Sequence, residues 1–406
     1  DVYKRQAHGS PFMSNGHATR DGLEQRERPT PCRRIQLTER AGRRVVHIGL
    51  ESGRTRRTAR CQAGAMTTDS PDLLVNEVSD ALAQRPFSGV VMIHLGGRPL
   101  LEVAAGAANR AEALPLTLGT RLATASATKG FTALAAVSRI GEGLLDFETR
   151  LVDVRDGDLP HVDRDVTSEP LLGHTSGVGD DLDEEQLDDV DDHVLDEPVP
   201  VLEGPEDYVP ILKRHRHPDP PGTRFVYNNS GYLMLALAIE RAANGSYHDE
   251  VRRRVFEPAG MTATDFLRSD RLPAETALGY LADGRTNVFH LPVIGTGDGG
   301  AYTTGPDMLR FWDAVLAGDI VDRSLVDRMT AARNRHSGGD HYGLGFWIGP
   351  DRTTVLLVGM DAGVSLRSGT NPVSGLTYCV IANNSADVWP LAAIVDRHLT
   401  DSAGPA

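Results

Sequence analysis

The sequence predicts an α+β fold in which both ends of the chain contribute strands to one antiparallel sheet. Two strand-forming runs in 87–106 meet at the Gly-Gly pair of residues 96–97, which is typical of a hairpin. Four more strand-like runs follow one another between residues 341 and 383. The region between them, about 141–290, is rich in loops and helical patterns, so we expect a mainly helical subdomain inserted into the sheet domain.

Helical periodicity accounts for most of the remaining predicted elements. A helix is expected at 70–84, before the hairpin, and a buried helix at 130–140, in the run GFTALAAVSRI. The inserted region carries two helical patterns, at 231–245 and 247–260. A last helix is expected at 390–400, so the domain should combine the sheet with flanking helices.

The first 65 residues differ in charge from the rest of the chain. Residues 1–65 hold 14 Lys and Arg against 6 Asp and Glu, whereas 66–406 hold 28 basic and 50 acidic residues. A basic arm for nucleic acid or membrane is one interpretation. We instead predict a disordered or non-genuine extension, with translation starting at Met66 and a single folded domain over 66–406. The acidic balance of that domain argues against nucleic acid.

The sequence also bears on where the protein acts. No apolar run approaches the roughly 20 residues of a membrane span, and the basic segment lacks the apolar core of a signal peptide. Cysteines are few, and Cys379 lies in the strand-like run LTYCVIA, where core packing is the simplest role. We therefore expect a cytoplasmic protein without a disulfide framework.

Lysine is the rarest charged residue of the chain, with three (Lys4, Lys129 and Lys213) against 39 arginines. Lys129 follows Ser126 by three positions, so the two side chains share a face of a helix. A serine hydroxyl needs a nearby base to become a nucleophile. Lysine can be that base because burial or neighbouring cations lower its pKa, whereas arginine stays protonated. The alternative is a surface lysine beside an unrelated serine.

A second pair of residues strengthens this interpretation. The stretch PPGTRFVYNNSGY places Tyr227 and Asn229 in a Y-x-N arrangement just before a predicted helix. A phenol near a lysine can relay the serine proton to the leaving group, and an asparagine amide can hold both the lysine and a substrate carbonyl. Taken alone, the stretch would be read as a tyrosine in a turn.

These motifs belong to an ordered series. The six blocks are Ser126-x-x-Lys129, LLGHTSGV (171–178), PPGTRFVYNNSGY (220–232), FEPAGMTATDF (256–266), GDGGAYTTGPDMLRFW (297–312) and YGLGFW (342–347). The series resembles the serine hydrolases of the β-lactamase superfamily, in the branch similar to class C β-lactamases and penicillin-binding proteins. That branch includes D-aminopeptidases, DD-peptidases and family VIII esterases. The resemblance covers roughly residues 75–400.

The resemblance implies a β-lactamase/transpeptidase-like fold and a set of roles. Ser126 would form a covalent acyl-enzyme, with Lys129 as base, Tyr227 as proton relay and Asn229 in support. The HTSG turn at 174–177 would be structural, because its histidine is not a triad residue in this family. No metal or organic cofactor is implied.

The third motif is where the sequence departs from the family, which carries K-T-G or H-x-G on a strand beside the serine. The matching positions are Leu357, Val358 and Gly359. Gly359 would let substrate approach the strand, and the backbone N–H of Met360 would complete an oxyanion hole with that of Ser126. The family's cation helps bind a substrate carboxylate, so its absence favours uncharged esters or amides. Arg367 is a candidate substitute charge.

Two polar stretches allow other interpretations. The acidic residues 180–197 are predicted to form a solvated loop, with a mobile lid as the alternative. The run HRHPD (His215, His217, Asp219) is similar to a zinc-binding H-x-H-x-D, but Pro220 stands where a second histidine would be needed. A solvated loop is expected there too.

The sequence therefore predicts a serine hydrolase that acts on a small-molecule ester, amide or peptide, with neither nucleic acid nor membrane as a partner. A β-lactamase or a D-amino-acid peptidase is the alternative within the same chemistry. A non-catalytic relative that binds ligands in the cleft is the alternative from another class. Retention of Ser126, Lys129 and Tyr227 together opposes that last alternative.

Overall fold

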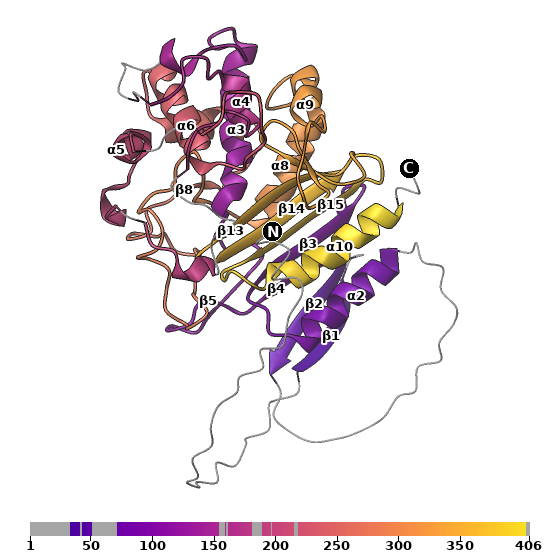
Figure 1. The fold of residues 1–406 in the computed structure, drawn as a ribbon. Helices are drawn as coiled ribbons and strands as arrows, with labels where there is room; N and C mark the ends of the chain where they lie inside the picture. The colour runs from indigo at the N-terminus through magenta and orange to yellow at the C-terminus, as the bar shows by residue number, and fades with distance from the viewer. Residues whose placement is uncertain are drawn as a thin grey trace, which may run out of the picture.

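The computed structural model describes residues 33–40, 43–50, 71–153, 159, 161–180, 189–195, 197–214 and 218–402. Within this part of the chain, the centre is a sheet built from strands far apart in the sequence (Figure 1). Its spatial order is β1-β2-β4-β3-β15-β14-β13-β12-β11-β10. Its strands are β1 (Arg33–Arg40), β2 (Arg43–Leu50), β3 (Gly89–Leu95), β4 (Arg98–Ala105), β10 (Asn334–Arg335), β11 (His341–Tyr342), β12 (Trp347–Ile348), β13 (Val355–Asp361), β14 (Val364–Asn371) and β15 (Leu376–Ala382).

The predicted antiparallel sheet from both chain ends is confirmed. The early hairpin β3–β4 joins the late strands where β3 pairs antiparallel with β15, from Leu95↔Leu376 to Gly89↔Ala382. The β2–β4 pairing is parallel. Short strands form two minor sheets, one of β5 (Ala107–Asn109) with β6 (Leu114–Pro115), the other of β7 (Leu122–Ala123), β9 (Ala301–Thr303) and β8 (Asp265–Phe266).

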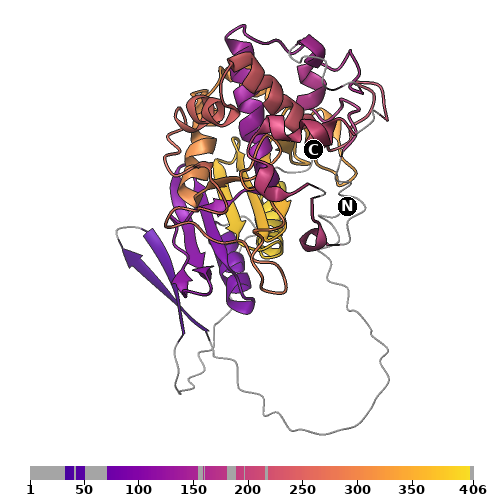
Figure 2. The same cartoon turned by 90° about the vertical axis from the view of Figure 1, so that its left-hand side faces the viewer.

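Helices cover both faces of the sheet and form the inserted region. The α-helices are α2 (Pro71–Gln84), α3 (Thr128–Gly141), α4 (Ser168–Leu172), α5 (Val209–Leu212), α6 (Asn229–Ala243), α7 (Tyr247–Val251), α8 (Gly305–Ala317), α9 (Arg323–Met329) and α10 (Val388–Ser402). Short turns of other helix types are η1 (Ala125–Ala127), η2 (Leu151–Asp153), η3 (Val190–Asp192), η4 (Val199–Val201), η5 (Pro205–Tyr208) and η6 (Arg252–Phe256). Figure 2 shows the helical region, including α3 and α6, gathered beyond one side of the sheet.

The sheet is buried on both faces, which explains why its strands read as nearly continuous apolar runs. Alternate residues of β3 point to opposite sides: Val91 and Ile93 join the core beneath α2 and α10, and Val90 and Met92 join the core around α3 and α8. Cys379 of β15 is fully buried in the second of these cores, as the sequence predicts.

Part of the segment predicted as an extension forms a hairpin. β1 and β2 pair from Arg33↔Leu50 to Arg40↔Arg43, and Val45 of β2 pairs with Glu102 of β4. The sequence showed one strand-like run there, RRVVHIGL, which is β2. The other residues of 1–65 lie outside the described part of the chain, so a dispensable extension stays a prediction.

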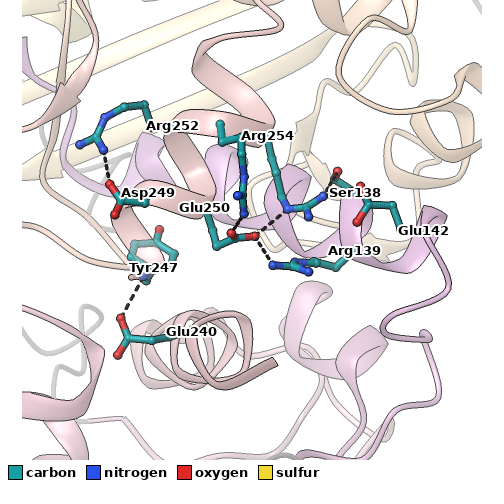
Figure 3. A network of polar contacts seen from close by, with 10 residues as sticks. Ser138, Arg139, Glu142, Glu240, Tyr247, Asp249, Glu250, Arg252 and Arg254 are labelled. Carbon is teal, nitrogen blue, oxygen red and sulfur yellow. Dashed lines mark hydrogen bonds and ion pairs between the residues drawn. The ribbon is translucent and has the colours of Figure 1, made fainter. Parts of the chain in front are cut away.

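The far end of α3 is fixed to the following helices by charged side chains (Figure 3). The Arg139 guanidinium donates to Glu250 Oε2 at 2.5 Å, and Arg254 Nε donates to the same oxygen at 2.7 Å. Arg254 also reaches Ser138 Oγ at 3.1 Å and Glu142 at 2.9 Å. This network anchors the helix that directly follows Ser126 and carries Lys129.

Among the described residues, no helix combines the length with the apolar character that crossing a bilayer requires.

Candidate active site

The candidate nucleophile lies in a strained turn. Ser126 is in η1, directly before α3, and the preceding Ala125 has a left-handed φ of 47°. Such a conformation is uncommon for a residue with a Cβ and persists only where the surroundings enforce it. The Ala125 carbonyl accepts hydrogen bonds from Thr128 Oγ1 at 2.8 Å and from the Gly300 N–H at 3.4 Å. These contacts fix the turn that presents Ser126.

Lys129 lies against the serine, as the spacing predicts. It is only 2% exposed, and its Nζ lies 2.9 Å from Ser126 Oγ. Nζ also donates to Asn229 Oδ1 and to the Asp298 carbonyl oxygen, each at 2.6 Å. Both of these oxygens can only accept, whereas the serine hydroxyl can also donate. A neutral amine that gives its two N–H bonds to these carbonyls therefore directs its lone pair at Ser126.

Strand β13 packs tightly against the nucleophile turn, and glycine is required at the contact. A Cβ on Gly359 would lie 2.1 Å from the Thr124 carbonyl oxygen and 3.2 Å from the Ser126 nitrogen. The sequence predicted that Gly359 lets substrate approach the strand. In the structure the close contact at Gly359 is with the turn η1. Met360 follows on the same strand, close to the turn; its N–H as an oxyanion donor stays a prediction.

Leu357, which stands where the family has a cation, is buried under α3. It is 2% exposed and belongs to the core around that helix. A Cβ on Gly130 would lie 2.5 Å from the Leu357 Cδ2 atom. The side chain therefore fills the space between β13 and α3 and brings no charge to the site.

Arg367 does not replace the missing cation, which corrects the suggestion made from the sequence. Its guanidinium pairs with Asp396 of α10, Nε to Oδ2 at 2.8 Å. In the sheet it stands opposite Val358 and Val380, which belong to the core beneath α2 and α10. The side chain thus lies on the face of the sheet opposite Lys129, because neighbouring strand residues alternate between faces.

Tyr227 is brought to the lysine from a distant part of the sequence. Lys129 Nζ lies 5.1 Å from the centre of the half-buried Tyr227 ring. The ring stacks on Trp347 with centroids 5.8 Å apart and an angle of 18°. His174 covers it with a centroid distance of 4.4 Å. Tyr227 is therefore held rigidly beside Lys129, and its role as proton relay stays a prediction.

His174, in the HTSG turn, supports the Tyr227 loop rather than facing Ser126. Its Nδ1 accepts the Asn228 N–H at 3.1 Å, and its carbonyl accepts the Val226 N–H at 2.9 Å. Since Nδ1 accepts, the proton of the neutral ring lies on Nε2, a buried atom with no partner among the described residues. Burial first, and then the charge of Lys129, lower the pKa of His174 well below 6.5.

Asp180 is a supporting residue that the sequence analysis missed. Its carboxylate accepts the backbone N–H groups of Asn229, at 2.6 Å, and Ser230, at 3.0 Å, at the start of α6. A carboxylate at a helix N-terminus accepts from backbone N–H groups that have no partner within the helix, and it interacts favourably with the helix dipole.

Asp191, in the same acidic stretch, is also buried. It is 8% exposed and accepts the Ala282 and Gly363 N–H groups. The prediction of a solvated loop is therefore wrong for these two carboxylates.

Other predicted features fall partly outside the described residues. These include 181–188 of the acidic stretch and both His215 and His217 of the HRHPD run. Asp219, which the structure describes, pairs with Arg224 at 3.5 Å. Within the described chain, no group of three or more His, Cys, Asp or Glu side chains is arranged to hold a metal.

Comparison with protein families and curated proteins gives consistent similarities. A family model described as Beta-lactamase matches residues 74–395. The putative penicillin-binding protein PbpX of Bacillus subtilis (strain 168) is 26% identical over 279 residues, which cover 68% of this chain and 65% of that protein. The chain thus spans somewhat less than two thirds of that relative.

Solved structures show the same fold. The structure of a penicillin-binding protein from Bacillus halodurans superposes with a TM-score of 0.74 and is 34% identical in sequence. The match covers 79% of this chain and 99% of the B. halodurans chain. A D-amino acid amidase from Ochrobactrum anthropi SV3, complexed with L-phenylalanine amide, gives a TM-score of 0.67 at 23% identity, with 80% and 97% covered. The amidase supports the fold alone, given its low identity.

Proposed function

Because this chain belongs to the beta-lactamase family, we propose that it hydrolyses small esters or amides through an acyl-enzyme on Ser126. It is a serine hydrolase of the superfamily that unites β-lactamases and penicillin-binding proteins. The non-catalytic alternative is set aside for this reason. The observation that carries the proposed mechanism is the 2.9 Å contact between Lys129 Nζ and Ser126 Oγ.

In the first half-reaction, the neutral Lys129 amine removes the Ser126 proton as Oγ attacks the substrate carbonyl carbon. The carbonyl π bond becomes an oxyanion, for which we propose the backbone N–H groups of Ser126 and Met360 as donors. Collapse of the tetrahedral intermediate expels the leaving group, and Tyr227 passes it the proton taken from serine. Asn229 and the Asp298 carbonyl hold Lys129 in position throughout.

In the second half-reaction, water attacks the ester of the acyl-enzyme. Lys129 and Tyr227 again transfer the protons: together they take one from the attacking water and return one to Ser126 Oγ. The acid product leaves and the serine is regenerated. The cycle balances without a redox step.

The substrate class follows from the charge of the site. Leu357 supplies no cation, and Arg367 pairs with Asp396 on the far side of the sheet. A substrate carboxylate would therefore lack the partner that it has in relatives with K-T-G. We propose esters or amides without that carboxylate ahead of β-lactams and peptides ending in D-Ala.

The mechanism is tested by Lys129→Arg, which keeps hydrogen-bond donors at this position but cannot act as a base, because a guanidinium does not release its proton. A positioned general base contributes roughly 10²–10⁴-fold, so kcat should fall by about that factor while thermal stability is retained. Ser126→Ala should abolish the acylation burst with a p-nitrophenyl ester, and Lys129→Arg should abolish it too. Turnover of Lys129→Arg within a few-fold of the parent would exclude Lys129 as the base and make Tyr227 the next residue to test.

The substrate class is tested by comparing nitrocefin with short-chain p-nitrophenyl esters. Ester kcat/KM should exceed that for nitrocefin by about tenfold, equivalent to about 1.4 kcal/mol of transition-state binding. A preference for nitrocefin would refute the interpretation of the third motif and favour a β-lactamase.

We also propose that the protein is cytoplasmic and that its catalytic domain begins near Met66. A chain starting at Met66 should fold and keep full activity. If it unfolds or loses activity, the β1–β2 hairpin is part of the domain.

A further inference from the structure

The loop 295–300 supplies the backbone carbonyl that contacts Lys129, and this loop packs tightly on α6. A Cβ on Gly297 would lie 2.2 Å from the Tyr232 carbonyl oxygen and 2.6 Å from the Ala236 Cβ atom, both of α6. The backbone of the loop is therefore in direct contact with that helix. Its hydrogen bonds to α3 and α7 then decide where its carbonyl groups point.

Two side chains on one face of α3 meet successive carbonyl groups of the loop. Lys129 and Thr132 are three residues apart, so they are neighbours on the helix surface. Lys129 Nζ donates to the Asp298 carbonyl at 2.6 Å, and Thr132 Oγ1 donates to the Gly297 carbonyl at 2.7 Å. The two rigid peptide planes that hold these carbonyls meet at the Asp298 Cα atom, so fixing one limits the other.

The Thr132 hydroxyl is itself oriented by a buried phenol. The Tyr247 hydroxyl of α7 lies 2.7 Å from Thr132 Oγ1, and both side chains are fully buried. A carbonyl oxygen only accepts, so the single Thr132 proton goes to Gly297 and Tyr247 donates to Thr132. Burial raises the pKa of the Tyr247 phenol, so it keeps the proton that it donates. A chain of hydrogen bonds thus runs from α7 through α3 to the loop.

The loop 295–300 has other anchors, so removal of this one hydroxyl is a local change. His248 Nε2 donates to the Gly295 carbonyl at 2.8 Å. The Thr296 N–H donates to the Gly299 carbonyl at 2.9 Å, which closes the loop on itself. These contacts hold the loop at its start and across its turn, whereas the Thr132 hydroxyl acts directly beside the carbonyl that Lys129 uses.

We propose that Thr132 is a positioning residue for the base of the reaction. Its hydroxyl holds the loop so that the Asp298 carbonyl keeps the Lys129 amine aimed at Ser126. The proposal rests on the proposed acyl-enzyme and adds to its mechanism. Without the hydroxyl, the carbonyl and the amine have more freedom, so the amine spends less time in the arrangement that removes the serine proton. Substrate binding stays the same, because Thr132 is fully buried.

The test measures acylation and substrate binding separately. Burst kinetics over a range of p-nitrophenyl butanoate concentrations give the acylation rate constant and the dissociation constant of the ester. Thr132→Val replaces the hydroxyl with a methyl group of similar size. Acylation should slow about fivefold, the factor that the loss of one hydrogen bond represents, with an unchanged dissociation constant. Thr132→Ser restores a hydroxyl and should acylate within about twofold of the parent.

A second variant tests the same chain of hydrogen bonds from α7. In Tyr247→Phe the Thr132 hydroxyl can still donate to Gly297, but it can also turn to the Thr128 carbonyl, 3.3 Å away on α3. Acylation should therefore slow by about twofold, less than in Thr132→Val. This variant decides the question if Thr132→Val does not fold, and a parent-like rate in Tyr247→Phe then overturns the proposal.

Thr370→Val is the matched control for stability. Thr370 is also buried, and its hydroxyl bonds to Thr377 at 2.9 Å. It lies about 13 Å along β14 from Leu366, the residue that pairs with Gly359. This exchange should lower the melting temperature about as much as Thr132→Val while leaving acylation unchanged.

The outcomes separate this proposal from the proposed mechanism. A parent-like acylation rate in Thr132→Val, or an equal loss in Thr132→Ser, overturns the positioning role. Weaker ester binding with an unchanged acylation rate in Thr132→Val overturns it too. If the parent shows no burst that depends on Ser126, the acyl-enzyme mechanism itself is wrong.

Discussion

The two ends of α3 each bury a basic side chain, and the groups around the two side chains differ. Lys129 at the start is 2% exposed, and Arg139 near the end is 7% exposed. Arg139 meets the carboxylate of Glu250, as Figure 3 shows. The hydrogen bonds described above join Lys129 Nζ to three neutral oxygens: a hydroxyl, an amide carbonyl and a backbone carbonyl.

The difference shows how one helix separates stability from chemistry. A carboxylate partner stabilises a permanent cation, which suits a structural role and a side chain that does not release its proton. Neutral acceptors hold an amine in place in either protonation state, which suits a base. The chain uses arginine at position 139, where the partner is a carboxylate, and one of its three lysines at position 129, beside Ser126.

The largest effect on stability is expected from Glu250→Gln. This change leaves the buried Arg139 without its carboxylate, and breaking a buried ion pair in this way costs about 3–5 kcal/mol. Urea unfolding should show the loss, with kcat of the remaining folded enzyme within a few-fold of the parent. Glu142→Gln removes an exposed partner of Arg254 and should cost less than about 1 kcal/mol. Equal losses for the two variants would contradict the comparison.

A smaller effect is expected from the reciprocal exchange Arg139→Lys. The charge remains, but the planar fork that joins Glu250 is lost, so the free energy of unfolding should fall by about 1–2 kcal/mol. The acylation burst should be retained, in contrast to Lys129→Arg. Loss of the burst in Arg139→Lys would mean that the far end of the helix also contributes to the chemistry.

His174 extends the comparison to a third buried basic group. Its folded-state pKa lies well below 6.5, so the unfolded chain binds more protons as pH falls below about 6.5. Stability that is complete above this pH is therefore lost as pH falls, by at most about 1.4 kcal/mol per pH unit from this residue. Burial also lowers the pKa of His248, so that residue contributes in the same direction. Melting temperatures between neutral and acid pH should show a flatter profile for His174→Asn than for the parent.

The smallest effect is expected on kcat, and it distinguishes the role of Nδ1 from that of Nε2 in the His174 ring. In His174→Asn the amide oxygen can still accept the Asn228 N–H, whereas the longer side chain of His174→Gln places its amide near the former Nε2. One hydrogen bond is worth about 1 kcal/mol, so kcat should fall about fivefold in His174→Gln and remain close to the parent in His174→Asn. If the order of the two variants is reversed, the Nδ1 contact does not position Tyr227.

The sequence predicted the parts of the fold and site that have a local pattern. The spacing of Ser126 and Lys129 placed them on one face of a helix, and alternating apolar runs predicted the central strands. The motif also predicted that Tyr227 lies near Lys129, 98 positions away in the sequence, and the ring does lie there, while its role stays a prediction. The Asp298 carbonyl was not found, because a backbone oxygen has no signature in the sequence.

Two other errors have physical causes that sequence spacing alone hides. Asp180 stands at the start of an acidic run, and nothing in that run distinguishes a carboxylate that caps a helix from its solvated neighbours. Arg367 follows Ser365 by two residues, and only the strand register shows that it faces α10 rather than α3. Contacts between distant segments decide both cases.

The scarcity of lysine has a practical consequence for following the site in solution. The chain holds only Lys4, Lys129 and Lys213, and of the two in the described residues Lys213 is exposed whereas Lys129 is buried. An amine-selective acylating reagent should therefore modify Lys213 rapidly and Lys129 only when its surroundings open. The ratio of the two labelling rates, read by peptide mass mapping, would measure how often the site becomes accessible, and an acyl group on Ser126 should slow the second rate.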